Sequence, residues 1–325
     1  MRFIPLKTAG VLFCGLLTVA ASGSALAQDY PNKPIRFIIA QGAGGTSDVL
    51  ARQVGQKLSE SLGQPVVIDN RPGAEGIVGL ETAAKAAPDG YTIAMGSTPN
   101  LAINYALYKK LPYDPIADFA SIALIGKTFY AVLVPTTSQA QSLGDFITMA
   151  RARPNQLNYG AGSSGARANI ELFTAATKIQ LSYVPYKSNT QALTDLVGGR
   201  LDLVLEPTSS AMPQVRGGKV KALAITSTTR LAQYPDLPTV SESGVPGFEY
   251  SAWASVIAPA GISPAIQHKL SLEVQKAIAK PDVIEKFRSL GFETQYAGPE
   301  QLSAMLRSDI AAYIKVVKDV GIPQQ

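Results

Sequence analysis

The chain has 325 residues, of which 46% are hydrophobic and 16% charged, and its formal net charge is +5. This composition is typical of a globular protein of about two domains, and the small positive surplus excludes a basic stripe for nucleic acid. With one histidine, one cysteine and no H-E-x-x-H motif, the sequence also lacks the common zinc sites and nucleophile–base pairs. It indicates no metal, no cofactor and no catalytic residue.

The first 27 residues have the pattern of a secretory signal peptide. Arg2 and Lys7 form a basic start, residues 9–21 are apolar but too few to span a bilayer, and residues 25–27 (ALA) form a small-residue cleavage site. Cleavage after Ala27 would remove Cys14, the only cysteine, and would lower the net charge to +3 because two basic residues and no acidic one lie in this segment. An exported chain without disulfides fits the bacterial periplasm.

Strand and helix patterns then alternate. Strands are expected at 34–40, 65–69 and 91–95, with helices at 47–62 and 76–86. A second series comprises strands at 130–134, 157–159, 181–185, 201–205 and 220–226 and helices at 143–151, 166–178 and 190–197. Strands separated by single helices predict an α/β fold with mainly parallel sheets and right-handed crossovers.

The last third is predicted to return to the first series. An irregular, proline-containing connection spans 230–247, followed by a strand at 253–257 and helices at 264–280, 282–289 and 299–320. These helices are expected to cover the apolar helix faces of the first series. The sequence therefore predicts lobe I from 28–126 with 250–325, lobe II from 127–249, and a cleft between them with a hinge at the two crossings.

Two glycine-rich turns are the strongest functional signal. Residues 41–48 (QGAGGTSD) and 160–167 (GAGSSGAR) each lie between a predicted strand and a predicted helix. A helix N-terminus gathers unpaired backbone N–H groups and the positive end of the helix dipole, so each turn is suited to hold an anion. Two such turns suggest two lobes facing one anionic ligand. The alternative is that the glycines only permit tight turns.

The second turn also has the spacing of a dinucleotide-binding motif, G-x-G-x-x-G, at Gly160, Gly162 and Gly165. That motif requires an acidic residue at the end of the next strand, whereas this strand leads into Tyr186 and Lys187. We therefore do not expect a nucleotide cofactor.

Three other residues each have two interpretations, and two more are expected to have no ligand role. Asp48 either caps its helix or orders the ligand loop, and Arg167 either pairs with a carboxylate or is a solvated charge. Glu206 follows a strand that should open into the cleft, where it could bind a ligand amine or hydroxyl or the opposite loop. His268 is expected to be a solvated helix residue, and Trp253 to pack in the core or hinge.

Short motifs along nearly the whole mature chain resemble the Bug family, the substrate-binding proteins of tripartite tricarboxylate transporters. They are residues 30–36 (YPNKPIR), 44–52 (GGTSDVLAR), 70–79 (NRPGAEGIVG), 84–92 (AKAAPDGYT), 107–114 (LYKKLPYD), 171–173 (ELF), 184–187 (VPYK), 236–244 (DLPTVSESG) and 258–261 (APAG). Each motif alone is weak, but their order and spacing together are specific.

The resemblance implies a two-lobed, type II-like periplasmic binding protein that closes on a small carboxylate. In this family the two glycine turns hold a carboxylate through backbone amides, hydroxyls and waters. The matching positions are Gly42, Ala43, Gly44, Gly45, Thr46, Ser47 and Asp48 in the first turn, and Ala161, Gly162, Ser163, Ser164, Gly165, Ala166 and Arg167 in the second. Gln41, directly before the first turn, is expected to contact the ligand as well. The far end of the pocket, which sets specificity, would use Ser97, Thr98, Tyr186, Lys187 and Glu206.

Some positions depart from the family pattern. Ala40 and Gln41 replace a usual proline and aromatic residue, which should enlarge or polarise the pocket. Ala161 and Ala166 stand where serine is frequent, and Asn169 where histidine is frequent. The general site is expected to remain despite these departures, but the ligand of any one family member cannot be transferred to this chain.

The resulting hypothesis is a monomeric periplasmic receptor that delivers a di- or tricarboxylate, an acidic amino acid or an aromatic acid to the membrane permease of a tripartite tricarboxylate transporter. One alternative is a ligand-dependent sensor that contacts the periplasmic domain of a membrane kinase. Another is an enzyme that uses the same cleft, which would turn over the bound acid.

Overall fold

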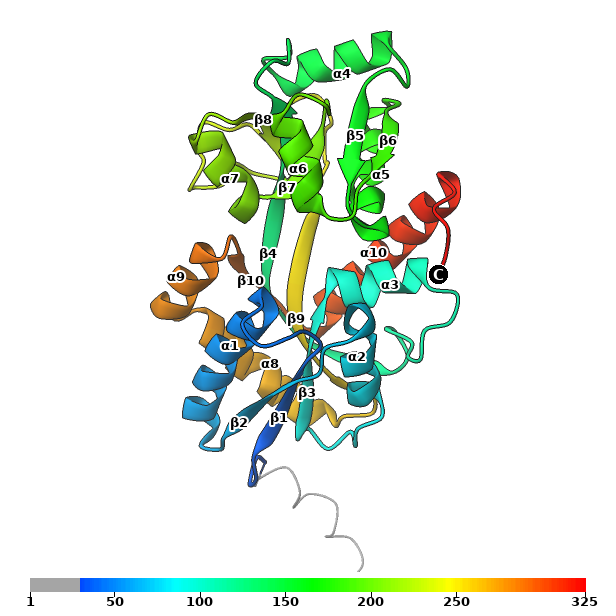
Figure 1. Ribbon diagram of the computed structural model, residues 1–325. Coiled ribbons are helices and arrows are strands. Elements are labelled where there is room, and N and C mark those ends of the chain that lie inside the picture. The colour runs from blue at the N-terminus through cyan, green and yellow to red at the C-terminus, as the bar shows by residue number, and fades with distance from the viewer. Residues whose placement is uncertain (1–29) are drawn as a thin grey trace, which may run out of the picture.

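The computed structural model describes residues 30–325, so the predicted signal peptide and Cys14 lie outside the described residues. Within that part of the chain no helix is both long and apolar enough to cross a membrane. Figure 1 shows two groups of elements, a lower group around β1–β3 and an upper group around β5–β8, connected by the strands β4 and β9.

The lower group is built on one sheet, here called the lower sheet, with strand order β10-β4-β9-β3-β1-β2. Strand β1 (Ile35–Ile39) pairs in parallel with β2 (Val66–Asn70) and β3 (Thr92–Ser97). Strand β9 (Ser251–Pro259) is antiparallel to β3 and to β4 (Phe119–Pro135), and β10 (Glu293–Ala297) is antiparallel to β4. The sheet is therefore mixed: it is parallel among the first three strands, as the alternating pattern predicts, and antiparallel where the later strands enter.

Alternate residues of β1 face two different cores. Ile35, Phe37 and Ile39 pack with α1 (Thr46–Leu62), α8 (Pro264–Ile278) and α9 (Pro281–Ser289), whereas Ile38 faces α2 (Ile77–Ala84) on the other side. Helix α1 turns Leu50, Val54 and Leu58 inward, at the spacing of one helix face. Helices α8 and α9 thus cover one face of the lower sheet.

The upper group uses the other end of β4. There β4 pairs with β7 (Val204–Pro207) and β8 (Val220–Ile225), and β5 (Asn158–Ala161) pairs in parallel with β6 (Ser182–Pro185). The helices of this group are α4 (Leu143–Ala152), α5 (Ser164–Thr177), α6 (Asn189–Val197) and α7 (Thr208–Arg216).

Strand β4 changes partners at one peptide unit. Phe129 pairs with Ser251 in the lower sheet, and the next residue, Tyr130, pairs with Pro207 of the upper group. Helix α10 (Pro299–Asp319) contacts α5 of the upper group as well as β4 and the short helix α3 (Asn104–Leu107) of the lower group. The segment after α10 is held against α3, because the Gln325 N–H donates to the Leu107 carbonyl at 2.8 Å.

Several elements were not predicted from the sequence. They are the 3-10 turn η1 (Ala74–Gly76), the π-helical segment η2 (Thr98–Ile103), α3, α7 and β10. The helix predicted at 76–86 is shorter, because Ala74, Glu75 and Gly76 all have positive φ angles and α2 begins only at Ile77. Helix α7 contains Pro213, and β10 is a half-buried edge strand without apolar alternation, so neither has a clear sequence signal.

Candidate functional site

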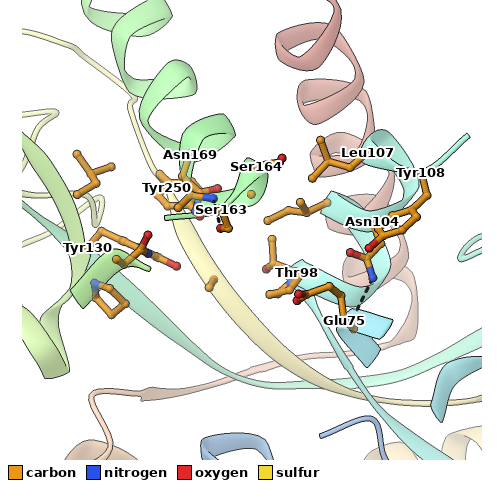
Figure 2. Close-up of a pocket in the computed structure, with 18 of the residues that line it drawn as sticks. Glu75, Thr98, Asn104, Leu107, Tyr108, Tyr130, Ser163, Ser164, Asn169 and Tyr250 are labelled. Carbon is orange, nitrogen blue, oxygen red and sulfur yellow. Dashed lines mark hydrogen bonds between the residues drawn. The ribbon is translucent and has the colours of Figure 1, made fainter. Parts of the chain in front are cut away.

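A cavity of about 320 Å³ lies where the N-terminus of α5 faces η2 and α3 across the gap between the two groups. Figure 2 shows Ser163, Asn169 and Tyr250 together near the start of α5, with Asn104, Leu107 and Tyr108 on the opposite side. Its polar lining residues are Glu75, Thr98, Asn104, Tyr108, Tyr130, Ser163, Ser164, Asn169, Asn189, Tyr250 and Gln325. Of the residues that line it within 30–325, Glu75 is the only one with a charged side chain.

The upper wall is the first turn of α5. Ser163 is the N-cap residue, and its Oγ accepts a hydrogen bond from the Ala166 N–H at 3.1 Å. Ser164 and Gly165 line the cavity, and backbone N–H groups in the first turn of a helix have no intrahelical acceptor. This wall therefore presents N–H donors and the positive end of a helix dipole to the cavity.

Three further side chains on the walls have an oxygen that accepts from the protein. Asn189 Oδ1 accepts from the Gly162 N–H at 2.7 Å, and Thr98 Oγ1 accepts from the Trp253 N–H at 2.9 Å. Asn169 Oδ1 accepts from the Tyr313 hydroxyl at 3.0 Å. In residues 30–325 neither asparagine Nδ2 atom donates to another protein atom. Both amides, like the Thr98 hydroxyl, thus have donor protons available for a ligand.

Gly162 explains why the second turn needs glycine. A Cβ atom at this position would lie 2.1 Å from the Ser188 carbonyl carbon and 2.2 Å from the Asn189 nitrogen. The turn between β5 and α5 therefore packs directly against the turn between β6 and α6, and this contact fixes Asn189 at the cavity. Within the G-x-G-x-x-G spacing, Gly162 therefore serves close backbone packing.

The lower wall is held by local hydrogen bonds around η2. The Ser97 N–H donates to Asn100 Oδ1 at 2.8 Å, which begins η2 directly after β3. Asn104 Nδ2 donates to the Glu75 carbonyl oxygen at 3.1 Å and ties α3 to the left-handed turn at η1. The Glu75 side chain is exposed and points toward Thr98 (Figure 2).

The first glycine turn lies at the carboxyl end of β1, outside the lining of this cavity, and residues 41–44 are exposed. The buried Asp48 orders it: its carboxylate accepts from the Gly44 N–H, from Arg52 Nε and from Asn70 Nδ2, each at 2.9 Å. Burial raises the pKa of the Asp48 carboxyl, but these hydrogen bonds outweigh burial and lower the pKa to about 2.

The structure does not place Arg167 at the cavity. Its guanidinium carbon lies 4.6 Å from the centre of the Tyr183 ring, its Nη2 donates to the Val320 carbonyl at 3.3 Å, and Nε lies 3.8 Å from Glu171 Oε1. The side chain therefore joins α5 to β6 and to the segment after α10.

Except for Thr98, the residues predicted at the far end also lie outside the lining. The Tyr186 hydroxyl donates to Asp195 Oδ2 at 2.9 Å, and Lys187 is exposed. Glu206 is buried in β7 with the Ser210 hydroxyl donating to its Oε2 at 2.9 Å, and burial raises the pKa of its carboxyl. His268 is exposed on α8, and Trp253 is buried, its Nε1 donating to Asp309 Oδ2 at 2.6 Å.

The cavity thus brings together five of the predicted ligand residues, which are Thr98, Ser163, Ser164, Gly165 and Ala166. It does not include residues 41–48, Ser97, Ala161, Gly162, Arg167, Tyr186, Lys187 or Glu206. It adds Glu75, Asn104, Tyr130, Asn189 and Tyr250 as well as Asn169, which the sequence marked only as a departure from a family pattern. Asn189 had a usable signal, since it begins the helix that follows a parallel strand after a short turn; the tyrosines had none.

Comparisons with known proteins agree with this architecture. A sequence model described as "Tripartite tricarboxylate transporter family receptor" matches residues 50–322. The chain is 32% identical over 309 residues to BugT of Bordetella pertussis, covering 94% of this chain and 95% of that protein.

Two solved structures are also similar. An R. palustris protein with adipate is 33% identical with a TM-score of 0.71, covering 91% of this chain and 99% of that one. MatC from Rhodopseudomonas palustris with bound malate is 31% identical with a TM-score of 0.68, covering 89% and 100%. They confirm the α/β fold expected from the sequence. The chain belongs to the tripartite tricarboxylate transporter receptor family, also called the TctC family, and is a solute-binding protein of this family of periplasmic receptors, not an enzyme.

Proposed function

We propose that the cavity captures a small organic carboxylate, which the protein delivers to the membrane permease of a tripartite tricarboxylate-type transporter. The observation that carries this proposal is the donor-rich wall at the start of α5. Ser163, Asn169 and Asn189 each use an oxygen to accept from the protein, which leaves donor protons beside the N–H groups of the first turn. Such a wall suits an anion.

A full countercharge is not required for this binding. Aligned N–H and O–H donors replace the water that a carboxylate loses on burial, and each hydrogen bond to a charged group contributes about 1.5–3 kcal/mol. The named ligands of the two related structures, adipate and malate, are both carboxylates and support the same class for this chain.

Closure of two lobes would complete the site. The proposed lobes are 28–126 with 250–325, and 127–249, turning about the strands that cross between them. The change of pairing partner between Phe129 and Tyr130, and the start of β9 at Ser251, support boundaries close to these. Closure would bring the first turn, residues 41–48, of which 41–44 are exposed, toward the second turn, so that both hold the same carboxylate.

The same proposal includes three further elements. The chain is exported by its first 27 residues, acts as a monomer, and presents its closed form to the permease. Ser97, Tyr186, Lys187 and Glu206 are proposed to shape the far end of the closed pocket.

The test is to identify the ligand directly. Native protein is purified from its own periplasm, and the bound acid is identified by mass spectrometry. Thermal unfolding is then followed with adipate, malate, citrate and benzoate. Binding of a ligand to the folded state raises the midpoint, by an amount set by its concentration relative to Kd. Adipamide, which has the length of adipate without its charge, is the matched control. An absence of any shift with every acid, together with an empty purified protein, would refute the proposal.

A further inference from the structure

Tyr313 lies behind the cavity wall, on α10. Its side chain is 2% exposed, and it is not among the residues that line the cavity. Its hydroxyl oxygen lies 3.0 Å from Asn169 Oδ1 and 3.4 Å from the Tyr250 hydroxyl oxygen, and both of these residues do line the cavity. Burial raises the pKa of Tyr313 well above its ordinary value, so its hydroxyl keeps its proton.

The contact with Tyr313 is made by the Oδ1 end of the Asn169 amide. The terminal torsion of asparagine is broad and nearly two-fold, so an amide without a fixed partner can present either its oxygen or its nitrogen. Here the oxygen is occupied by the Tyr313 hydroxyl, and Asn169 Nδ2 has no protein acceptor within residues 30–325. Asn169 is 8% exposed and lies on α5 one and a half turns from the N-terminal residue Ser164.

We propose that Asn169 is a ligand-binding residue that donates through Nδ2 to an oxygen of the bound acid, and that Tyr313 is the positioning residue that holds it in this orientation. This inference depends on the proposed carboxylate-binding function. It assigns a specific ligand group to the pocket: an acceptor oxygen of a carboxylate or hydroxyl at this end, with an ammonium group disfavoured there.

The same cluster reaches the crossing strands. The rings of Tyr250 and Tyr130 lie 4.8 Å apart between centres, and Tyr130 is the residue at which β4 changes partners. Tyr313 therefore contacts the ligand-facing amide and, through Tyr250, the point where the two groups of elements meet. A ligand oxygen bound to Asn169 would thus be linked, through side-chain contacts of Tyr313 and Tyr250, to Tyr130 at the proposed hinge.

A double-mutant cycle tests this assignment. Affinities for adipate and malate are measured by calorimetry on the full mature chain with Asn169→Ala, Tyr313→Phe and both changes together. Asn169→Ala is expected to weaken binding about 10- to 100-fold, as for the loss of a hydrogen bond to a charged group. Tyr313→Phe is expected to weaken binding about 3- to 10-fold, and to have no further effect in the Asn169→Ala background. Asn169→Asp is expected to bind more weakly than Asn169→Ala, because it places a like charge before the acid.

Tyr30→Phe is the control for losing a buried tyrosine hydroxyl. Tyr30 is 4% exposed, and its hydroxyl donates to the Gly90 carbonyl at 2.7 Å, far from the cavity lining. This variant is expected to unfold at a lower temperature but to keep wild-type affinity. The positioning role is overturned if the wild type binds either acid and Tyr313→Phe binds it equally well. It is also overturned if the losses in binding free energy caused by Asn169→Ala and Tyr313→Phe simply add in the double variant. In both cases the carboxylate function stands. If the wild type binds neither adipate nor malate nor any other acid, both proposals fall.

Discussion

Replacing Gly162 with alanine tests the packing that places Asn189 at the cavity. The new Cβ would lie 2.1 Å from the Ser188 carbonyl carbon and 2.4 Å from its Cα, so the turn between β6 and α6 has to move. Overpacking of this kind costs about 1–3 kcal/mol. The hydrogen bond from the Gly162 N–H to Asn189 Oδ1, 2.7 Å long, would be lost or lengthened, at about 1 kcal/mol.

The two effects together predict that the free energy of unfolding falls by about 2–4 kcal/mol. At about 2–4 °C for each kcal/mol, the midpoint of thermal unfolding should fall by roughly 5–15 °C. Affinity for the acid should fall as well, because Asn189 is released from its position. Urea unfolding and calorimetry of ligand binding measure the two effects separately.

Gly144→Ala is the matched control. Gly144 lies in the first turn of α4, and an added Cβ would meet nothing closer than Ser142 Oγ at 3.7 Å. This variant should be neutral or slightly more stable, since alanine favours a helix over glycine by up to about 1 kcal/mol. Equal stabilities for Gly162→Ala and Gly144→Ala would refute the close-packing argument.

Three other changes test the charged residues. The lowered pKa of Asp48 predicts a contribution to stability that is complete above about pH 4 and lost as the pH falls toward 2. The free energy of unfolding of Asp48→Asn, measured in urea, should therefore change less with pH in this range than that of the wild type. An equal change in the two proteins would contradict the ordering role of Asp48. Arg167→Ala should lower the free energy of unfolding by about 1 kcal/mol, because the Val320 and Tyr183 contacts are lost. It should change the affinity for the acid less than about threefold. A loss of about 1.5–3 kcal/mol in binding free energy would instead support the ligand contact predicted from the sequence. The raised pKa of Glu206 means that the charged form of its carboxyl is disfavoured in the folded protein. Glu206→Gln should therefore be as stable as the wild type or more stable at pH 7, and the difference in stability should shrink as the pH falls through the raised pKa. Marked destabilisation of Glu206→Gln at pH 7 would show that the charged form is needed.

Local signals predicted the regular elements well. The helix expected at 47–62 is α1, because polar residues and glycines precede it and Gly63 ends it in the left-handed conformation. The helix expected at 166–178 begins two residues earlier, at Ser164, because Ser163 is its N-cap. The strand expected at 130–134 is only the upper part of β4, since an apolar run does not show where a strand passes from one sheet to another.

Much of the cavity could not be predicted, because its residues meet through long-range pairing. Tyr130 and Tyr250 are far apart in the sequence and come into contact only because β4 and β9 pair along their length. Asn169 and Tyr313 meet because α10 returns to lie against α5. Arg167 shows the opposite difficulty: its position suggested a ligand contact, but its guanidinium packs on an aromatic ring and donates to a carbonyl, while its buried Nε has no hydrogen-bond partner among residues 30–325.

The strand order of the lower sheet has a consequence for how the protein is made. Strand β9 lies between β4 and β3, and the outer strand β10 comes later still. The sheet therefore cannot form its centre until residue 259 has been synthesised, and its edge until residue 297. Contacts between distant parts of a chain form slowly. The lower sheet of this protein therefore stays incomplete for most of the time that the chain is being synthesised. For a chain that is proposed to be exported, the lower sheet therefore closes only when nearly the whole sequence is available.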